Sequence, residues 1–305
     1  MHLNDYDSYI EICPPKEFNF EECLIFLGRS DQEVLHQIRD ESVYKLLKVD
    51  KELILCKIGY VNNAIKVEFP ISIPTSYARK KIGEYVWEWF GLSQNLEKFY
   101  QMAYQDKILQ SLAHEYSGLR IIGIPDLFEA LVWAIIGQQI NLTFAYTLKK
   151  RFIEQFGEFL IFEGQKFWLF PSFKKIALLN IEDLKKFQFT TRKAEYIIDI
   201  AKAMAKGELS KEQLVQKKDF QQIHSSLLQF RGIGAWTADY VIMKCLHYPS
   251  AFPISDVGLH NALKNQLGLE RKPTIEEIKE YAANWEGWQA YATFYLWRSL
   301  YDNEI

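Results

Sequence analysis

Cysteine is scarce in this sequence, and the few cysteines lie far apart. Four occur in 305 residues, at Cys13, Cys23, Cys56 and Cys245, and no two of them have C-x-x-C spacing. Structural zinc sites and iron–sulfur clusters take their ligands from closely spaced cysteines, so we expect no such metal site. Scattered free thiols are typical of a reducing compartment, which predicts a cytoplasmic protein.

Long apolar runs are also missing. No stretch of about 18 consecutive apolar residues occurs, and the first residues lack a basic segment followed by an apolar one. We therefore expect neither a transmembrane helix nor a signal peptide, and no membrane partner. Hydrophobic residues make up 49% of the chain and charged residues 25%, as in a soluble globular protein with a substantial core.

The chain has no strong excess of charge of either sign. Its formal net charge is −3 at pH 7, which alone does not indicate a nucleic-acid partner. The middle of the chain differs, because residues 141–218 contain 15 lysines and arginines against 9 aspartates and glutamates. This local excess fits one basic face, and it fits ordinary solvated helix faces equally well.

The first 75 residues show the alternation of apolar and polar residues that is typical of half-buried strands. Strands are expected at residues 43–49, 52–60 and 65–69, with a turn at residues 61–63 between two of them. A helix is expected from Asp31 to Arg39. These segments predict a small antiparallel sheet with one helix.

Prolines at 70 and 74 interrupt the alternation, and from about Tyr77 the periodicity becomes helical. Asp126 and Glu129 have the spacing of a capping box at the start of an apolar helix. Helices are expected at residues 126–136, 141–157, 191–206, 220–230, 235–246, 255–267, 274–285 and 288–301. The chain is therefore predicted to be α+β, with an antiparallel sheet domain over residues 1–75 and a helical region over residues 76–305.

Two glycines mark the most informative turn. Gly232 and Gly234 lie between two expected helices, and Asp256 follows the second helix. Backbone amides at a helix N-terminus bind a phosphate oxygen without a charged side chain, and glycine lets the phosphate approach closely. A phosphate site near a carboxylate suggests chemistry on a nucleic-acid backbone or on a base beside it.

Further motifs accompany this turn along most of the chain. They are Tyr116–Arg120, Phe128–Ala130, Ile136–Gln139, Arg192–Tyr196, Gly232–Ala238, Phe252–Pro253 with Asp256, Trp285, Trp288, Tyr291–Ala292 and Trp297. Together they resemble the helix-hairpin-helix DNA glycosylases of the DNA-3-methyladenine glycosylase II type. The resemblance implies two helical lobes with an active-site cleft between them. It also implies a monomer that works on damaged double-stranded DNA, near the bacterial nucleoid, without cofactor or obligate protein partner.

The resemblance assigns the catalytic role to Asp256. Hydrolysis of an N-glycosidic bond develops positive charge on the deoxyribose, and a nearby carboxylate stabilises that charge and orients or deprotonates a water. The alternative role of Asp256 is that of a helix N-cap. Asp239 is the nearest rival carboxylate, and we interpret it as a surface or capping residue.

The resemblance places Trp236, Tyr240 and Trp297 around the extruded base, with Phe26 reaching the pocket from the sheet domain. Electron-rich rings attract a cationic alkylated purine, although each ring could instead serve in core packing. Bifunctional members of the superfamily carry a lysine where this chain has Trp236. The chain is therefore expected to hydrolyse the bond without nicking the strand.

The expected DNA contacts come from two loops. The amides of Gly232 and Gly234 should hold a phosphate, and the hydroxyl of Thr237 should add to them. The resemblance also implies that carbonyls of this turn can bind a monovalent cation. Gln139 or Ile140 occupies the position of the wedge that fills the space left by the base, unless both simply end a helix.

Two positions depart from the pattern of some members, which have tyrosines where this chain has Arg298 and Val257. The lesion spectrum therefore stays open. Excision of alkylated purines such as 3-methyladenine and 7-methylguanine is the leading prediction. The alternatives are a glycosylase for an oxidised purine and a helix-hairpin-helix DNA-binding protein without catalysis.

Overall fold

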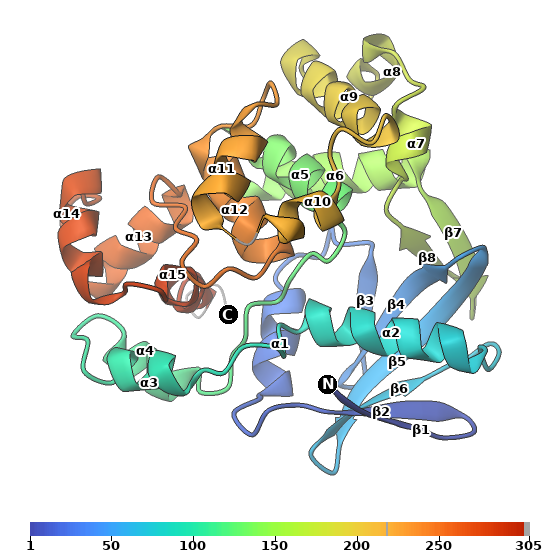
Figure 1. Cartoon of the computed structure of the whole chain (residues 1–305), viewed down its shortest axis with the longest axis horizontal. Coiled ribbons are helices and arrows are strands. Elements are labelled where there is room, and N and C mark those ends of the chain that lie inside the picture. Colours follow the sequence, from blue (N-terminus) through green and yellow to red (C-terminus); the bar gives the residue numbers. More distant parts are fainter. Residues whose placement is uncertain (218, 302–305) are drawn as a thin grey trace.

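The computed structural model describes residues 1–217 and 219–301 and begins with an antiparallel sheet (Figure 1). Its six strands follow the order β1-β2-β6-β5-β4-β3. They are β1 (His2–Asp5), β2 (Tyr9–Cys13), β3 (His36–Arg39), β4 (Ser42–Val49), β5 (Glu52–Val61) and β6 (Ala64–Glu68). The three predicted strands are confirmed as β4, β5 and β6. Asn62 and Asn63 form the predicted turn with φ of 52° and 61°, the left-handed values that this kind of hairpin requires.

The predicted helix from Asp31 to Arg39 is wrong. Its second half is the edge strand β3, which pairs with β4 from His36↔Lys45 to Arg39↔Ser42. The first half is a loop in which the Glu33 carboxylate accepts hydrogen bonds from the two following backbone amides at 2.9 and 2.8 Å. Pairing with β4 supplies hydrogen bonds over a longer range than the local pattern can reveal. Strands β1 and β2 were not predicted.

Helices cover the sheet and build the rest of the chain. They are α1 (Phe20–Leu27), α2 (Ser76–Trp89), α3 (Glu97–Ala103), α4 (Gln110–Glu115), α5 (Leu127–Gly137), α6 (Leu142–Phe156), α7 (Phe173–Ile176), α8 (Ile181–Lys185), α9 (Thr191–Ala205), α10 (Lys211–Gln216), α11 (Phe220–Leu228), α12 (Ala235–Cys245), α13 (Val257–Gln266), α14 (Ile275–Tyr281), the 3-10 turn η1 (Ala282–Asn284) and α15 (Gln289–Arg298). The predicted α+β class is confirmed. None of the helices in the described ranges is long and apolar enough to cross a membrane.

The predicted helix starts are largely confirmed, because side chains satisfy amides that the helix leaves free. Asp126 accepts the amide of Glu129 at 2.7 Å, and Asn141 accepts that of Phe144 at 2.8 Å. Glu129 does not complete the predicted capping box. Its carboxylate instead lies 3.9 Å from the Lys149 Nζ, where a buried cation competes for it.

Segments distant in sequence meet in space. Helices α3 and α4 lie beside α13–α15 (Figure 1), and α4 contacts α15. The Tyr100 and Tyr295 hydroxyls are 2.9 Å apart, and the Trp285 indole donates to Asp106 at 3.0 Å. An unpredicted hairpin, β7 (Glu158–Phe162) and β8 (Gln165–Leu169), packs against β4 of the sheet. One apolar core therefore runs through both the sheet and the helices.

Candidate active site

The glycine turn lies between α11 and α12, as predicted (Figure 1). Gly232 has a φ of +91°, and a Cβ built there would lie 2.3 Å from the Tyr196 ring of α9. Gly234 caps α12 with a φ of −92°, and a Cβ there would meet nothing within 4 Å. Gly232 therefore serves packing and backbone conformation, whereas Gly234 leaves open space at the N-terminus of α12.

Gln138 connects this turn to the end of α5, a role that the sequence did not reveal. Its Nε2 donates to the Gly232 carbonyl at 2.9 Å and to the Thr237 hydroxyl at 3.0 Å. Thr237 is 2% exposed, so its hydroxyl faces the interior of the hairpin. The hydroxyl accepts a hydrogen bond from Gln138 and is shielded from solvent, so this geometry disfavours the predicted contact of Thr237 with phosphate, which stays a prediction.

Asp256 is held by three donors. As the N-cap of α13 it accepts the amide of Leu259 on Oδ1 at 2.9 Å. The indole N–H of Trp297 donates to the same oxygen at 2.8 Å, and that of Trp236 donates to Oδ2 at 3.0 Å. The N-cap interpretation of Asp256 is therefore confirmed, and the cap orients a carboxylate that also accepts hydrogen bonds from tryptophans of two other helices. Its catalytic role stays a prediction.

The aromatic residues predicted for the base pocket lie together. The ring centroids of Trp236 and Tyr240 are 5.6 Å apart, and those of Tyr240 and Trp297 are 6.1 Å apart. The Trp133 indole donates to the Tyr240 hydroxyl at 2.9 Å and fixes that ring. Phe26 of α1 is buried and packs against Phe294, which in turn lies beside Trp297.

Gly258 is a second residue that the sequence did not reveal. A Cβ at this position would lie 2.9 Å from the Asp256 Oδ1 and 3.2 Å from the Trp297 indole. A side chain here would press on the hydrogen bond between those two groups. Its backbone does not need the left-handed region, so no turn motif could have identified it.

Arg298 and Val257, where some members of the family have tyrosines, have different surroundings. Arg298 is buried, and its Nε donates to the Glu22 carboxylate at 2.7 Å while its guanidinium lies 4.4 Å from the centroid of the Tyr116 ring. Val257 is 63% exposed at the start of α13. Arg298 therefore ties α15 to α1, and Val257 faces solvent beside Asp256.

The loop between α5 and α6 exposes Gln139 and Asn141, of which Asn141 is the N-cap of α6. Gln139 has a φ of +56° and is exposed, whereas Ile140 is partly buried against the core. Buried Lys193 donates to the Ile136 carbonyl at 2.7 Å and satisfies an acceptor at the end of α5. The end of this helix is thus fixed, and Gln139 projects from a rigid base.

Asp239 differs from the prediction of a surface or capping residue. It is half-buried within α12, and its Oδ1 lies 3.6 Å from the His224 Nε2. Burial raises the pKa of Asp239 to about 7. The cap of α12 is Gly234, so Asp239 has neither predicted role.

Asp239→Asn is expected to stabilise the protein at pH 8 but not below about pH 4. Because the folded-state pKa is raised, the folded chain binds the proton more tightly than the unfolded chain does. The free energy of unfolding therefore falls as the pH rises from about 4 to about 7 and then levels off. Urea unfolding of both proteins across this range measures the difference, and a constant difference at every pH would contradict the expectation.

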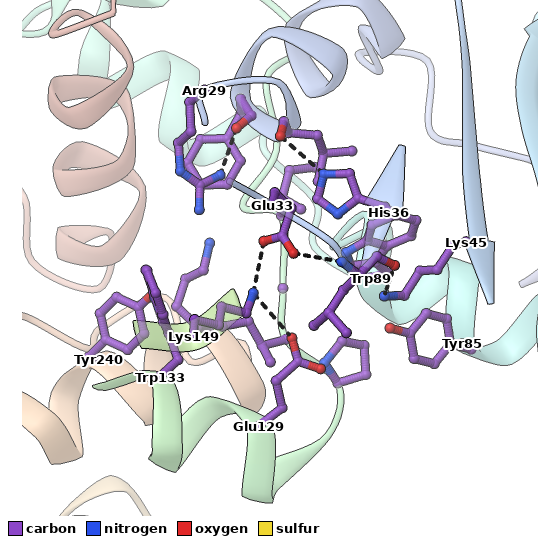
Figure 2. Close-up of a pocket in the computed structure, with 18 residues that line it drawn as sticks. Arg29, Glu33, His36, Lys45, Tyr85, Trp89, Glu129, Trp133, Lys149 and Tyr240 are labelled. Carbon is purple, nitrogen blue, oxygen red and sulfur yellow. Dashed lines mark hydrogen bonds and ion pairs between the residues drawn. The ribbon is translucent and has the colours of Figure 1, made fainter. Parts of the chain in front are cut away.

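A cavity of about 50 Å³ lies between the sheet domain, α5 and α12. Figure 2 shows Lys149 between Glu33 and Glu129, with Tyr240 and Trp133 on one side and Lys45 and Tyr85 on the other. The Lys149 Nζ is 2.8 Å from the Glu33 carboxylate, which lies in the loop before β3. The nearby ammonium of Lys149 and several hydrogen bonds keep the pKa of Glu33 below its ordinary value despite burial. This ion pair joins the two parts of the chain.

Two protein-family models together match most of the chain. The model of the HhH-GPD superfamily base excision DNA repair proteins matches residues 132–288, and that of the 8-oxoguanine DNA glycosylase N-terminal domain matches residues 12–131. The chain is 43% identical to a DNA-3-methyladenine glycosylase of Bacillus subtilis, over 99% of this chain and 100% of that protein.

Solved structures share the fold. The 3-methyladenine DNA-glycosylase from Archaeoglobus fulgidus matches with a TM-score of 0.81 and 24% identity, over 97% of this chain and 98% of that one. The DNA complex of the Clostridium acetobutylicum 8-oxoguanine glycosylase/lyase matches with a TM-score of 0.76 and 18% identity, over 100% and 99%. With the sequence matches, these show that the chain belongs to the HhH-GPD superfamily of base excision DNA repair proteins.

Proposed function

We propose that the chain is a monofunctional DNA N-glycosylase that removes alkylated purines of the 3-methyladenine and 7-methylguanine class. The observation that carries this proposal is the pair of hydrogen bonds that the indoles of Trp236 and Trp297 donate to the two carboxylate oxygens of Asp256. These hydrogen bonds join the proposed catalytic carboxylate directly to the aromatic residues of the proposed base pocket. The Bacillus subtilis relative, named a DNA-3-methyladenine glycosylase, supports the same substrate class.

Asp256 supplies the negative charge in this proposal. Loss of the base leaves positive charge on the deoxyribose, and a fixed carboxylate stabilises it without reorganisation. The same carboxylate orients the water that attacks the sugar. Its three donors hold it in one orientation, so it can meet the developing charge directly.

The rings provide selectivity for a positively charged base. Trp236, Tyr240 and Trp297 present electron-rich rings whose neighbouring centroids are 5.6 and 6.1 Å apart. Cation–π attraction favours a cationic purine over a neutral one by ~0.5–2 kcal/mol. An alkylated purine is already a good leaving group. The site therefore has little need of a separate general acid.

Duplex DNA is bound in this proposal by the hairpin and by the loop after α5. The amides at Gly232 and Gly234 hold a phosphate at the positive end of α12, where a monovalent cation bound by turn carbonyls would add to the attraction. We assign the wedge to Gln139, because it is exposed while Ile140 packs against the core. Flipping of the base costs a few kcal/mol, which the wedge offsets by filling the vacated space.

We also propose a division of labour along the chain. Residues 1–75 form a sheet domain that closes the pocket from behind through Phe26. Residues 76–305 carry the hairpin, Asp256 and the wedge on two helical lobes around the site. In this proposal the protein works as a monomer. It acts at the bacterial nucleoid.

The test uses methylated duplex DNA. Wild-type protein should release 3-methyladenine and 7-methylguanine as free bases and leave strands that break only after alkali, because Trp236 stands where a lyase needs a lysine. The match to the 8-oxoguanine glycosylase domain over residues 12–131 makes an 8-oxoguanine duplex the appropriate second substrate. Release of 8-oxoguanine alone, or strand breakage without alkali, would contradict the proposal. Duplex binding without any release would indicate a binding protein.

A further inference from the structure

One buried amine on the hairpin helix has no use in the site described above. Trp236, Tyr240 and Lys244 follow each other at intervals of four residues, so they share one face of α12. Lys244 is 2% exposed, and its Nζ makes no hydrogen bond within the described ranges. One face of α12 therefore carries Trp236, which donates to Asp256, then Tyr240, and then the unsatisfied amine of Lys244.

Aromatic faces surround this amine. The Lys244 Nζ lies 4.6 Å from the centroid of the Phe26 ring and 4.8 Å from that of Phe294. Lys244 and Tyr240 both line the cavity of about 50 Å³, a volume that admits one or two water molecules. The amine thus has room to move by a small distance toward a group that enters beside Tyr240.

The carboxylates of the same cavity are engaged elsewhere. Glu33 and Glu129 lie 2.8 and 3.9 Å from the Nζ of Lys149 (Figure 2). No ion pair to Lys244 is found in the described part of the chain. A buried amine without a hydrogen-bond or ion-pair partner costs free energy that an apolar side chain of the same length avoids. A stability cost of this kind is typical of a group that acquires its partner from a ligand.

Given the proposed function, we propose that Lys244 is a specificity-determining residue. Its amine forms the floor of the base pocket and accepts a hydrogen bond from the 6-amino group of extruded 3-methyladenine.

The charge state of the amine fits this role. Burial, and then the nearby Arg29 guanidinium, hold the pKa of Lys244 well below its ordinary value. A neutral amine has a free lone pair, whereas an ammonium only donates. Aliphatic amines accept hydrogen bonds better than they donate them, so the amino edge of an adenine suits this group better than the carbonyl edge of a guanine. A neutral amine also does not repel a cationic base.

The test is the Lys244→Met variant on methylated duplex under single-turnover conditions, with both released bases measured in the same sample. Methionine keeps the length and replaces the amine by a thioether, which is only a weak acceptor. We expect release of 3-methyladenine to fall by about tenfold, as for the loss of one hydrogen bond, and release of 7-methylguanine by less than about threefold. The ratio of the two rates is the readout, because a purely structural change lowers both rates alike.

Matched variants and controls make the outcome unambiguous. Lys244→Gln restores a carbonyl acceptor and should keep the rate ratio within about threefold of wild type, and Lys244→Leu repeats the loss of the acceptor with another side chain. The Tm of the methionine variant should be equal or higher, and its affinity for a duplex with an abasic-site analogue should be unchanged. Equal losses for both bases, or an unchanged ratio, would overturn the inference. A wild-type protein that releases neither base would instead contradict the proposed function.

Discussion

Asp256→Asn is expected to lower the rate of base release by about 10³-fold while the protein stays folded and binds duplex DNA. The rate falls because the variant has no negative charge to place against the positive sugar. The substitution should leave the local backbone structure unchanged. Asparagine is as good an N-cap as aspartate, so the hydrogen bond from the Leu259 amide persists and α13 keeps its start.

One local cost does accompany the exchange. The carboxylate accepts one indole N–H on each oxygen, whereas an asparagine amide has one accepting oxygen and one donating nitrogen. With the amide oxygen kept where it accepts from Leu259 and Trp297, the nitrogen would face the N–H of Trp236, and that ring would lose its partner. We expect a drop of about 1–3 kcal/mol in the free energy of unfolding from the unpaired donor, too little to unfold the protein.

Single-turnover release of 3-methyladenine measures the effect, with the Tm and the affinity for an abasic-site duplex measured on the same preparations. Asp239→Asn is the matched control, since it makes the same chemical change in α12 and leaves the Asp256 contacts intact. It should retain the wild-type rate within about threefold, as expected away from the reacting atoms. A loss of less than tenfold in Asp256→Asn would remove Asp256 from the catalytic role.

The parts of the site that the sequence predicted are those that local chemistry defines. A Gly-x-Gly turn between two periodic segments specifies its own geometry, and Asp256 follows it at a short distance along the chain. Asn141 and Asp126 marked helix starts for the same reason. Trp236 and Tyr240 share a face of α12 by their spacing alone. All of these depend on residues close in sequence.

The parts that the sequence did not reveal depend on contacts between distant residues. Gln138 reaches the hairpin across 94 residues, and nothing in its neighbourhood indicates this partner. The segment from Asp31 to Arg39 was predicted to be helical, but pairing of its second half with β4 and the ion pair of Glu33 with Lys149 decide its conformation. Thr237 was expected to add its hydroxyl to the phosphate site, and the hydroxyl instead accepts a hydrogen bond from Gln138. Local sequence patterns do not indicate which distant residues will be in contact in the folded chain.

Gly232→Ala should destabilise the protein by about 3 kcal/mol and reduce the affinity for duplex DNA by about tenfold or more. Two costs combine at this position. Its φ of +91° is strained for any residue with a Cβ, and the new methyl group would lie 2.3 Å from the Tyr196 ring, which must move. The turn would then lose the orientation of the amides that we propose to hold a phosphate. Thermal unfolding and duplex binding at fixed salt measure the two effects.

Gly234→Ala separates packing from phosphate contact. A methyl group at Gly234 meets nothing within 4 Å, and its φ of −92° suits any residue. Alanine is a poorer N-cap than glycine, so we expect a destabilisation of about 1 kcal/mol or less. If a phosphate approaches this amide, the methyl group occupies its path, and duplex affinity should fall by at least about threefold in a protein of nearly wild-type Tm. Unchanged duplex affinity in Gly234→Ala would mean that the hairpin does not hold the DNA through this amide. The loss in Gly232→Ala would then be attributed to unfolding of the turn alone.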